Sequence, residues 1–242
     1  PEGVTSINEL AFRGSSSLQS IEIPASVTSI ELSAFHSCSN LATVIFGENS
    51  QLTSIGDYAF SSCDSLQSIE IPASVISIGE EAFGGCAFQT IEIPASVSSI
   101  GKWAFSSCDK LTSITVEENN QNYKSIDGNL YSKDGKTLLQ YPRGKTATTF
   151  AIPEGVTSIN EFAFYLCSSL QTIEIPASVI SIGEEAFSGC SFLKSIELPA
   201  SVTSIGDLAF IGCSNLATVT FGENSQLTRI GDYAFAGCSK LS

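Results

Sequence analysis

The sequence is poor in the residues that build catalytic and metal-binding sites. Its 242 residues include a single histidine, His36, a single tryptophan and no methionine. No pair of cysteines has the C-x-x-C spacing of a zinc ligand set, and the chain contains neither a glycine-rich phosphate loop nor the acidic spacing of an EF-hand. We therefore expect a protein that is not an enzyme, with no catalytic residue, no cofactor and no metal.

Basic residues are also scarce, because 11 Lys and Arg stand against 25 Asp and Glu and give a net charge of −14. Nucleic acid and anionic membrane surfaces both require a basic footprint, so the charge argues against both as partners. No apolar run approaches the ~18 residues of a membrane helix, and no signal peptide is present. Since methionine is absent, we expect residue 1 not to be a native start and the chain to be a piece of a longer protein.

What the sequence has in abundance is repetition. Residues 66–88 read LQSIEIPASVISIGEEAFGGCAF, and this stretch returns with small changes from end to end. It contains an apolar strand, a proline corner, a short apolar pair, a glycine break, an EEAF turn and a cysteine. The position of Val75 recurs every 22 to 25 residues apart from one gap of 59, and its copies are Val4, Val27, Leu52, Val97, Val156, Val179, Val202 and Leu227. A fixed period of this length is typical of a repeat solenoid.

Side chains in the apolar strand alternate, with Ile69 and Ile71 on one face and Ser68 and Glu70 on the other. One coil buries roughly eight apolar side chains, and each burial stabilises the fold by about 1.5–3 kcal/mol. Ordering each of the ~23 residues of the coil costs about 1.5 kcal/mol of conformational entropy, so a single coil is not stable alone. Neighbouring coils must therefore stack, with equivalent strands side by side and parallel. The acidic start of EEAF favours a short 3₁₀ or helical turn.

The regular spacing is interrupted once. We expect about five coils in residues 1–116, an irregular or hairpin insertion in 117–149 and about four coils in 150–242, all in one continuous solenoid. Two Asp-Gly pairs, at Asp127 and Asp134, are strong hairpin signals. A decayed repeat is the alternative, with SIDGNLY aligned to SIGDYAF and LLQYP aligned to SIEIP. Both interpretations stay open.

The eight cysteines form one row, because each follows its repeat phenylalanine by three residues; they are Cys38, Cys63, Cys86, Cys108, Cys167, Cys190, Cys213 and Cys238. Stacked equivalents lie about one coil apart, whereas a disulfide needs Cβ atoms near ~3.8 Å. We therefore predict buried free thiols that pack as small apolar groups.

The repeat pattern SLxSIEIPASVTSIGxxAFxxCSSL resembles the BspA-like surface proteins, also called Treponema pallidum-type leucine-rich repeats, and the interruption resembles one found in that family. The resemblance covers nearly the whole chain, and the departures are Ser15 in the cysteine row and Glu31 in the glycine position. It implies a leucine-rich-repeat-like right-handed superhelix, mainly parallel β, in a bacterial cell-surface or secreted protein that adheres to host or matrix proteins. No single binding residue can be carried over from it.

Two surfaces are candidate binding sites. The outward face of the strands carries rows of hydroxyl and carboxylate side chains, which we represent by Ser68, Glu70, Thr90, Glu92, Thr172 and Glu174. The insertion concentrates basic and tyrosine residues in a candidate epitope of Lys124, Tyr131, Lys133, Lys136, Tyr141, Arg143 and Lys145. Insertions on a rigid scaffold often carry binding, although a solvated hairpin has the same composition.

The function predicted from the sequence is a non-catalytic, extracellular protein-binding module that uses the solenoid face and the insertion. Its expected partners are extracellular host or matrix proteins, with glycans as an alternative, and we expect a monomer with no membrane insertion. A structural spacer whose repeats serve length alone is the alternative function.

Overall fold

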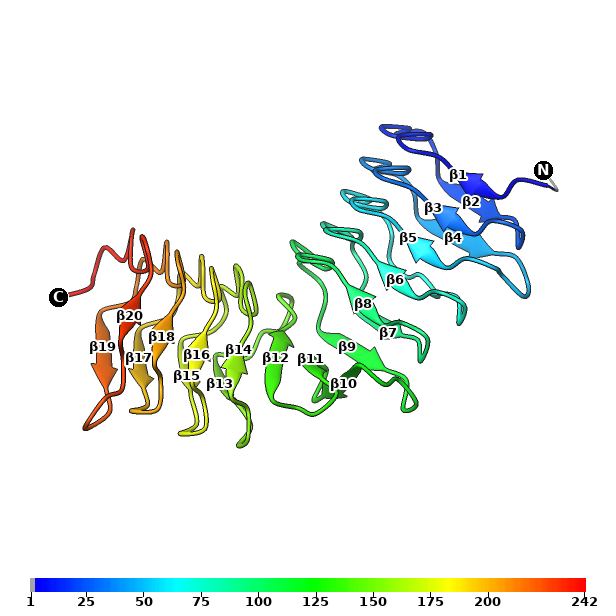
Figure 1. Cartoon of the computed structure of the whole chain (residues 1–242). Helices are drawn as coiled ribbons and strands as arrows, with labels where there is room; N and C mark the ends of the chain where they lie inside the picture. Colours follow the sequence, from blue (N-terminus) through cyan, green and yellow to red (C-terminus); the bar gives the residue numbers. More distant parts are fainter. Residues whose placement is uncertain (1–2) are drawn as a thin grey trace. The chain divides into compact units, whose positions relative to one another are not determined.

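The computed structural model describes residues 3–242, so the first two residues of the first predicted coil lie outside it. The chain consists of two compact units, Pro1–Ser125 and Ile126–Ser242. The described residues form twenty β-strands joined by turns, with no helix. Figure 1 shows the strands of each unit stacked side by side, one coil after another. The predicted solenoid of mainly parallel β-structure is confirmed, and the boundary between the units falls inside the predicted insertion, 117–149.

The coils of the first unit provide two-residue back strands and longer front strands, although not every coil has a front strand. The back strands form one parallel sheet of five: β1 (Ser6–Ile7), β3 (Ser29–Ile30), β5 (Ser54–Ile55), β6 (Ser77–Ile78) and β8 (Ser99–Ile100). The front strands form two separate parallel pairs: β2 (Ser20–Ile23) with β4 (Thr43–Phe46), and β7 (Thr90–Ile93) with β9 (Ser113–Val116). The front sheet of this unit is therefore interrupted between β4 and β7.

The second unit has a continuous front sheet of four parallel strands: β13 (Thr149–Ala151), β15 (Thr172–Glu174), β17 (Ser195–Leu198) and β19 (Thr218–Phe221). Its back sheet continues through β12 (Thr137–Gln140), β14 (Ser158–Ile159), β16 (Ser181–Ile182), β18 (Ser204–Ile205) and β20 (Arg229–Ile230). The same sheet begins with β10 (Tyr123–Ile126), which crosses the boundary between the units, and β11 (Asn129–Ser132).

The core of each unit contains a column of aromatic rings, one from each coil. In the first unit nearly parallel phenylalanine rings follow one another with centroids 5.1, 5.1, 5.7 and 5.9 Å apart, through Phe12, Phe35, Phe60, Phe83 and Phe105. In the second unit the spacings are 4.8, 5.0 and 5.1 Å through Phe164, Phe187, Phe210 and Phe235. A side chain that stacks on its own copy in the next coil explains why the repeat retains phenylalanine at this position.

The EEAF segments form turns instead of the predicted 3₁₀ or helical turns. In residues 80–86 the backbone is left-handed at Glu81, with φ of 49°, and again at Gly85, with φ of 78°. These residues interrupt any helical run, and they direct alternate amide groups along the stack. Phe35 N–H donates to Ala59 C=O at 2.8 Å, and equivalent bonds recur from coil to coil. We call this set the turn ladder, and it joins the coils on a third side beside the front and back sheets.

The serine of the IPAS corner links neighbouring coils through its side chain. Its Oγ donates to the carbonyl of the Val75 position in the preceding coil at 2.6–2.7 Å; the donors are Ser26, Ser74, Ser96, Ser178 and Ser201. The cysteines do the same at another corner, because each Sγ donates to the C=O of the aromatic-column residue in the preceding coil, as Cys190 does to Phe164 at 3.1 Å. These contacts give the PAS and cysteine positions of the repeat a physical role.

All eight cysteines are free thiols, and the predicted burial is confirmed for every one except Cys238, which is half-buried. Desolvation raises the pKa of these thiols, to about 12 at Cys63 and Cys213 and well above the usual value at Cys190. At neutral pH they are therefore neutral, weakly nucleophilic groups.

The predicted hairpin is confirmed. Strands β11 and β12 are antiparallel, and the turn between them contains Asp134 and Gly135, the latter with a positive φ of 76°. A second tight turn, with positive φ at Asp127 (51°) and Gly128 (73°), precedes β11. The repeat resumes within the same hairpin, since Leu138 pairs with Ile159 in the back sheet. LLQYP thus provides a back strand and turn, and does not correspond to the front strand SIEIP as the decayed-repeat alignment proposed.

The glycine that follows the back strand is required by close packing between coils. A Cβ atom on Gly101 would lie 2.5 Å from the backbone nitrogen of Glu80 and 2.6 Å from the carbonyl carbon of Gly79. The residues that follow the back strand of the preceding coil cannot accept that approach without moving their backbone.

We therefore predict that Gly101→Ala lowers the free energy of unfolding by about 1–3 kcal/mol, because a well-packed backbone contact must open to admit the methyl group. Urea unfolding followed by circular dichroism measures the change. Glu31→Ala is the matched control, since Glu31 already carries a side chain at the same position of its coil. An unchanged midpoint for Gly101→Ala would contradict the close-packing account.

The raised thiol pKa values predict slow alkylation that quickens with pH. Iodoacetamide at pH 8 should modify half-buried Cys238 at least tenfold faster than Cys190, because the thiolate is the reactive species and access to it is needed. Peptide mass spectrometry after timed quenching gives the two rates. In denaturing urea the rates should converge, and equal rates in the native protein would refute the prediction.

Candidate functional site

The six residues chosen to represent the outward face are all exposed on the front side of their units. In the second unit Thr172 lies between Thr149 and Ser195 on adjacent strands, and Glu174 lies beside Ala151. In the first unit Thr90 pairs with Ser113 and Glu92 with Thr115. The hydroxyl row predicted from the sequence thus exists as adjacent residues within each unit.

The interruption of the first front sheet falls at residues 66–71, the segment that defined the repeat. Among the residues described, no backbone hydrogen bond joins Ser68–Ile71 to β4 or to β7. The back sheet continues through this coil by the pairing of β5, β6 and β8. The turn ladder also continues, since Phe60 N–H donates to Ala82 C=O and Phe83 N–H donates to Ala104 C=O. Only the front of the coil is open.

A groove of about 620 Å³ lies between β4 and the open segment, and we call it the front groove. Its walls are residues 43–47 on one side and 68–74 on the other, with Asn49 and Ser50 at one end. A smaller hollow of about 400 Å³ lies on the other side of the segment, lined by Gln67, Ser68, Ala87, Gln89, Thr90 and Lys110. Ile69 is half-buried here and Ile71 is 9% exposed, whereas Ile91 and Ile93 in the same positions of the next coil are 2% and 0% exposed.

Two phenylalanines flank the open segment at positions where most other coils have aliphatic residues, although Phe221 at the end of β19 also occupies the Phe46 position. Phe46 on β4 stands in the position of Ile23, its register partner, and buried Phe88 stands in the position of Leu66. Phe88 also packs edge-on against Phe83, with centroids 6.0 Å apart. The larger rings accompany the widest spacings of the phenylalanine column, 5.7 and 5.9 Å on the two sides of Phe83. The added volume gives a physical reason for the front of this coil to separate from both neighbours.

The insertion does not present its tyrosines as the sequence suggested. Tyr131 is fully buried, and burial raises its pKa to about 12. Tyr141 is 3% exposed and continues the aromatic column, with its ring centroid 5.3 Å from that of Phe164. Desolvation raises the pKa of Tyr141 to about 12. Both rings belong to the core of the second unit and are unavailable to a partner.

Lys145 serves the hairpin turn. Its Nζ donates to Asp127 C=O at 2.6 Å and to Asn129 Oδ1 at 2.7 Å, and it lies 5.0 Å from the centroid of the Tyr141 ring. Partial burial lowers its pKa, while the nearby Asp127 carboxylate opposes that shift. Lys145 is therefore a structural residue of the candidate epitope.

The remaining basic residues of the epitope are divided. Lys133 and Lys136 are exposed at the turn between β11 and β12, whereas Arg143 is half-buried in the same unit. Lys124 lies half-buried on β10 in the first unit. The exposed part of the epitope thus reduces to one hairpin turn with two lysines.

A buried asparagine that the sequence analysis did not single out closes the last regular coil of the first unit. Asn120 is completely buried; its Nδ2 donates to Pro94 C=O and Val97 C=O at 2.8 and 2.9 Å. Its Oδ1 accepts the amide protons of Asn122 and Tyr123 at 2.8 Å. All its polar atoms are used within the fold, so it is a structural residue.

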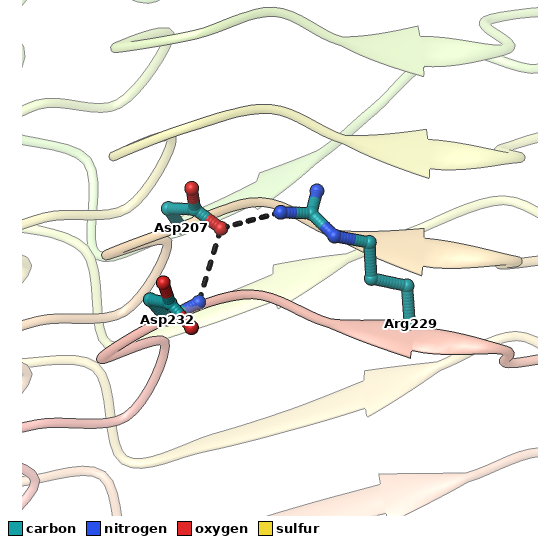
Figure 2. Close-up of polar contacts among 3 residues, drawn as sticks. All are labelled: Asp207, Arg229 and Asp232. Atoms are coloured by element: carbon teal, nitrogen blue, oxygen red, sulfur yellow. Dashed lines mark hydrogen bonds and ion pairs between the residues drawn. The ribbon is translucent and has the colours of Figure 1, made fainter.

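An ion pair joins two coils at the back of the second unit (Figure 2). Asp207 Oδ1 accepts Arg229 Nη2 at 2.7 Å and the amide of Asp232 at 3.0 Å. Both charged side chains are largely exposed, so the pair contributes on the order of 0.2–1 kcal/mol to stability. It connects two adjacent coils of the second unit.

The described residues contain no cluster of His, Cys, Asp and Glu that could hold a metal ion. They also contain no helix long and apolar enough to cross a membrane. The arrangement offers recognition surfaces: exposed rows of hydroxyls and carboxylates in both units, the front groove in the first and a lysine-bearing turn in the second.

Comparison with known proteins places these features in a family. Residues 1–51, 48–133 and 143–242 match the BspA type leucine rich repeat region in six copies. A leucine-rich repeat protein from Eubacterium ventriosum has a similar solved structure, with 29% identity, a TM-score of 0.85 and coverage of 100% of this chain and 70% of its own. No curated protein matches the chain.

Two further solved structures are similar. The pneumococcal vaccine antigen PcpA aligns over 99% of this chain and 72% of its own, with 25% identity and a TM-score of 0.71. A leucine rich cell surface protein from Faecalibacterium prausnitzii aligns over 99% and 82%, with 29% identity and a TM-score of 0.57. Because the family match extends over nearly all of the sequence, the resemblance inferred from the repeat is confirmed: the chain belongs to the BspA-type leucine-rich repeat family.

Proposed function

We propose that this chain is a non-catalytic protein-binding module of a bacterial surface or secreted protein, with an adhesive role toward extracellular host or matrix proteins. The observation that carries the proposal is the front side of each unit, where hydroxyl and carboxylate side chains stand exposed on a backbone fixed by three sets of bonds between coils. Solenoids commonly use such extended faces for binding. One similar structure is named a cell surface protein, which supports the location.

The chemistry of the titratable groups favours binding over catalysis. Burial raises the pKa of the buried thiols, so they are neutral and weakly nucleophilic at neutral pH. The glutamates of the front face are exposed and repeat with the coil, which is the pattern of a solvated surface. We therefore assign the module no reaction, and expect it to act as a monomer.

Charge indicates the kind of partner. The net charge of −14 and the front carboxylates favour a partner with a basic contact surface, because complementary charge speeds encounter and selects the partner. Extracellular matrix proteins with basic segments fit this description better than acidic glycans do.

The proposal predicts that arginine on the front face disrupts binding. Thr172→Arg with Glu174→Arg, or Thr90→Arg with Glu92→Arg, should weaken binding to immobilised extracellular-matrix proteins at least tenfold, through added bulk and reversed charge. Biolayer interferometry with a panel of purified matrix proteins gives the affinities. The matched control is Ser168→Arg with Glu184→Arg, which makes the same changes at exposed turn positions of the second unit.

Comparison of the variants separates the two candidate surfaces. Lys133→Ala with Lys136→Ala removes the exposed charges of the hairpin turn and should leave binding within twofold if the front face is used. Full affinity in both front-face variants would refute the proposed site. No binding by the unaltered protein to any member of the panel would favour the structural spacer.

A further inference from the structure

We propose that the front groove of the first unit binds an extended peptide segment of its protein partner, which adds as a β-strand and alternates apolar with basic residues. This rests on the proposed function and names the chemistry of the partner. The groove differs from the rest of the front side because it offers backbone as well as side chains. Its two walls are β4 and the open segment 66–71, neither of which is paired across the groove.

The register identifies which backbone groups face the groove. Thr43 N–H donates to the C=O of Gln19, which directly precedes β2. Gly47 N–H, directly after β4, donates to the C=O of Ile23. The odd-numbered residues of β4 therefore face β2. In a parallel ladder alternate residues point to opposite sides, and therefore Val44 and Phe46 direct their amide and carbonyl groups into the groove. An exposed strand edge of this kind is a template for strand addition.

The opposite wall offers a matching set. Glu70 occupies the position of Ile45 in the repeat, which faces the preceding coil, so its N–H and C=O point toward β4 across the groove. No backbone hydrogen bond uses either group among the described residues. A peptide in the groove therefore meets unpaired donors and acceptors on both sides. Buried backbone groups are normally paired, so these groups favour a ligand whose backbone pairs with them.

Side chains around the groove specify the composition of the peptide. Inward-facing Phe46 and Ile69 are half-buried and provide apolar contacts below the peptide. Outward-facing Ile45 is 55% exposed and lies beside Glu22 in the register, with Glu70 on the far wall. A lysine stem can cover Ile45 while its ammonium group meets these carboxylates. A strand with apolar residues inward and lysines outward satisfies both sets.

The walls are held in place without the peptide. The back sheet and the turn ladder both continue through the open coil, so its front edge is fixed by two of the three sets of bonds. Fixing a site in advance reduces the entropy lost on binding. The groove volume, about 620 Å³, falls in the range typical of ligand sites, roughly 300–1,000 Å³. In the second unit β13, β15, β17 and β19 pair in sequence, so the equivalent positions between them provide an internal control.

The probe is a synthetic acetylated and amidated heptapeptide of alternating lysine and valine, titrated into the full chain by isothermal calorimetry. Two control peptides have the same charge: one carries N-methyl groups on alternate amides, and the other has the three valines together. We expect saturable one-to-one binding of the alternating peptide, and at least tenfold weaker binding of both controls. Equal binding of all three would show attraction by charge alone and would overturn the proposal.

Two protein variants locate the site. Glu70→Lys should weaken the alternating peptide at least tenfold, whereas Glu184→Lys makes the same change at an exposed turn of the second unit and should leave the affinity within twofold. Circular dichroism confirms that both variants fold. Hydrogen exchange adds a backbone readout, because the amides of Val44, Phe46 and Glu70 should gain protection with the peptide. Unchanged exchange at these amides would refute strand addition.

The two proposals fail separately. If the unaltered protein binds matrix proteins and loses that binding with Thr172→Arg and Glu174→Arg, while the heptapeptide does not bind, the front face is used and strand addition is wrong. If the heptapeptide binds as expected but no matrix protein binds, the groove recognises an extended segment and the proposed class of natural partner is wrong.

Discussion

The structure depends on backbone hydrogen bonds that run from each coil to the next. They occur in three sets, in the front sheet, the back sheet and the turn ladder, and side chains reinforce them at the corners. The serine of the IPAS corner and the cysteine after the turn both donate to carbonyls of the preceding coil, as Ser96 and Cys108 do to Val75 and Phe83. A single coil has few partners for these groups, so stability is a property of neighbouring pairs of coils. These contacts give the small polar residues of the repeat a structural role beside that of its apolar residues.

Much of this fold could be predicted from the sequence because repetition turns local patterns into global ones. The period and the alternation of Ile69 and Ile71 with Ser68 and Glu70 sufficed to predict a parallel solenoid with an outward polar face. The two Asp-Gly pairs, Asp127-Gly128 and Asp134-Gly135, predicted a hairpin from turn chemistry, and β11 and β12 form it around Asp134-Gly135. The conformation of the EEAF turns was not predictable in the same way. The acidic residues there favour a helix start in isolation, but the bonds between coils require left-handed backbone at Glu81, and the bonds prevailed.

The insertion and the front groove show where sequence reasoning fails. Tyr141 was grouped with nearby lysines as a recognition residue, yet it takes the place of phenylalanine in the aromatic column, a role set by its neighbour in the next coil. The front groove depends on Phe46 and Phe88, which are apolar like the residues they replace. The apolar pattern of the sequence is the same with phenylalanine as with an aliphatic residue at these positions. Packing, however, depends on side-chain volume, which is larger for phenylalanine. The signal that could have been noticed is the 22-residue spacing that brings Phe88 into the position of leucine.

The same repeat therefore provides two kinds of surface. Where the front sheet is continuous, its backbone groups are used internally and a partner meets side chains alone, mostly those of Ser, Thr and Glu, which suits broad and adjustable contacts. Where the front sheet is open, its backbone groups become available to a partner. Because their donors and acceptors have a fixed spacing, they favour a partner segment in the extended conformation, and its side chains matter second. An opening at every coil would leave too few bonds between neighbours. An opening at one coil, braced on its two other sides, keeps the stack intact and gives an otherwise uniform surface one distinct position.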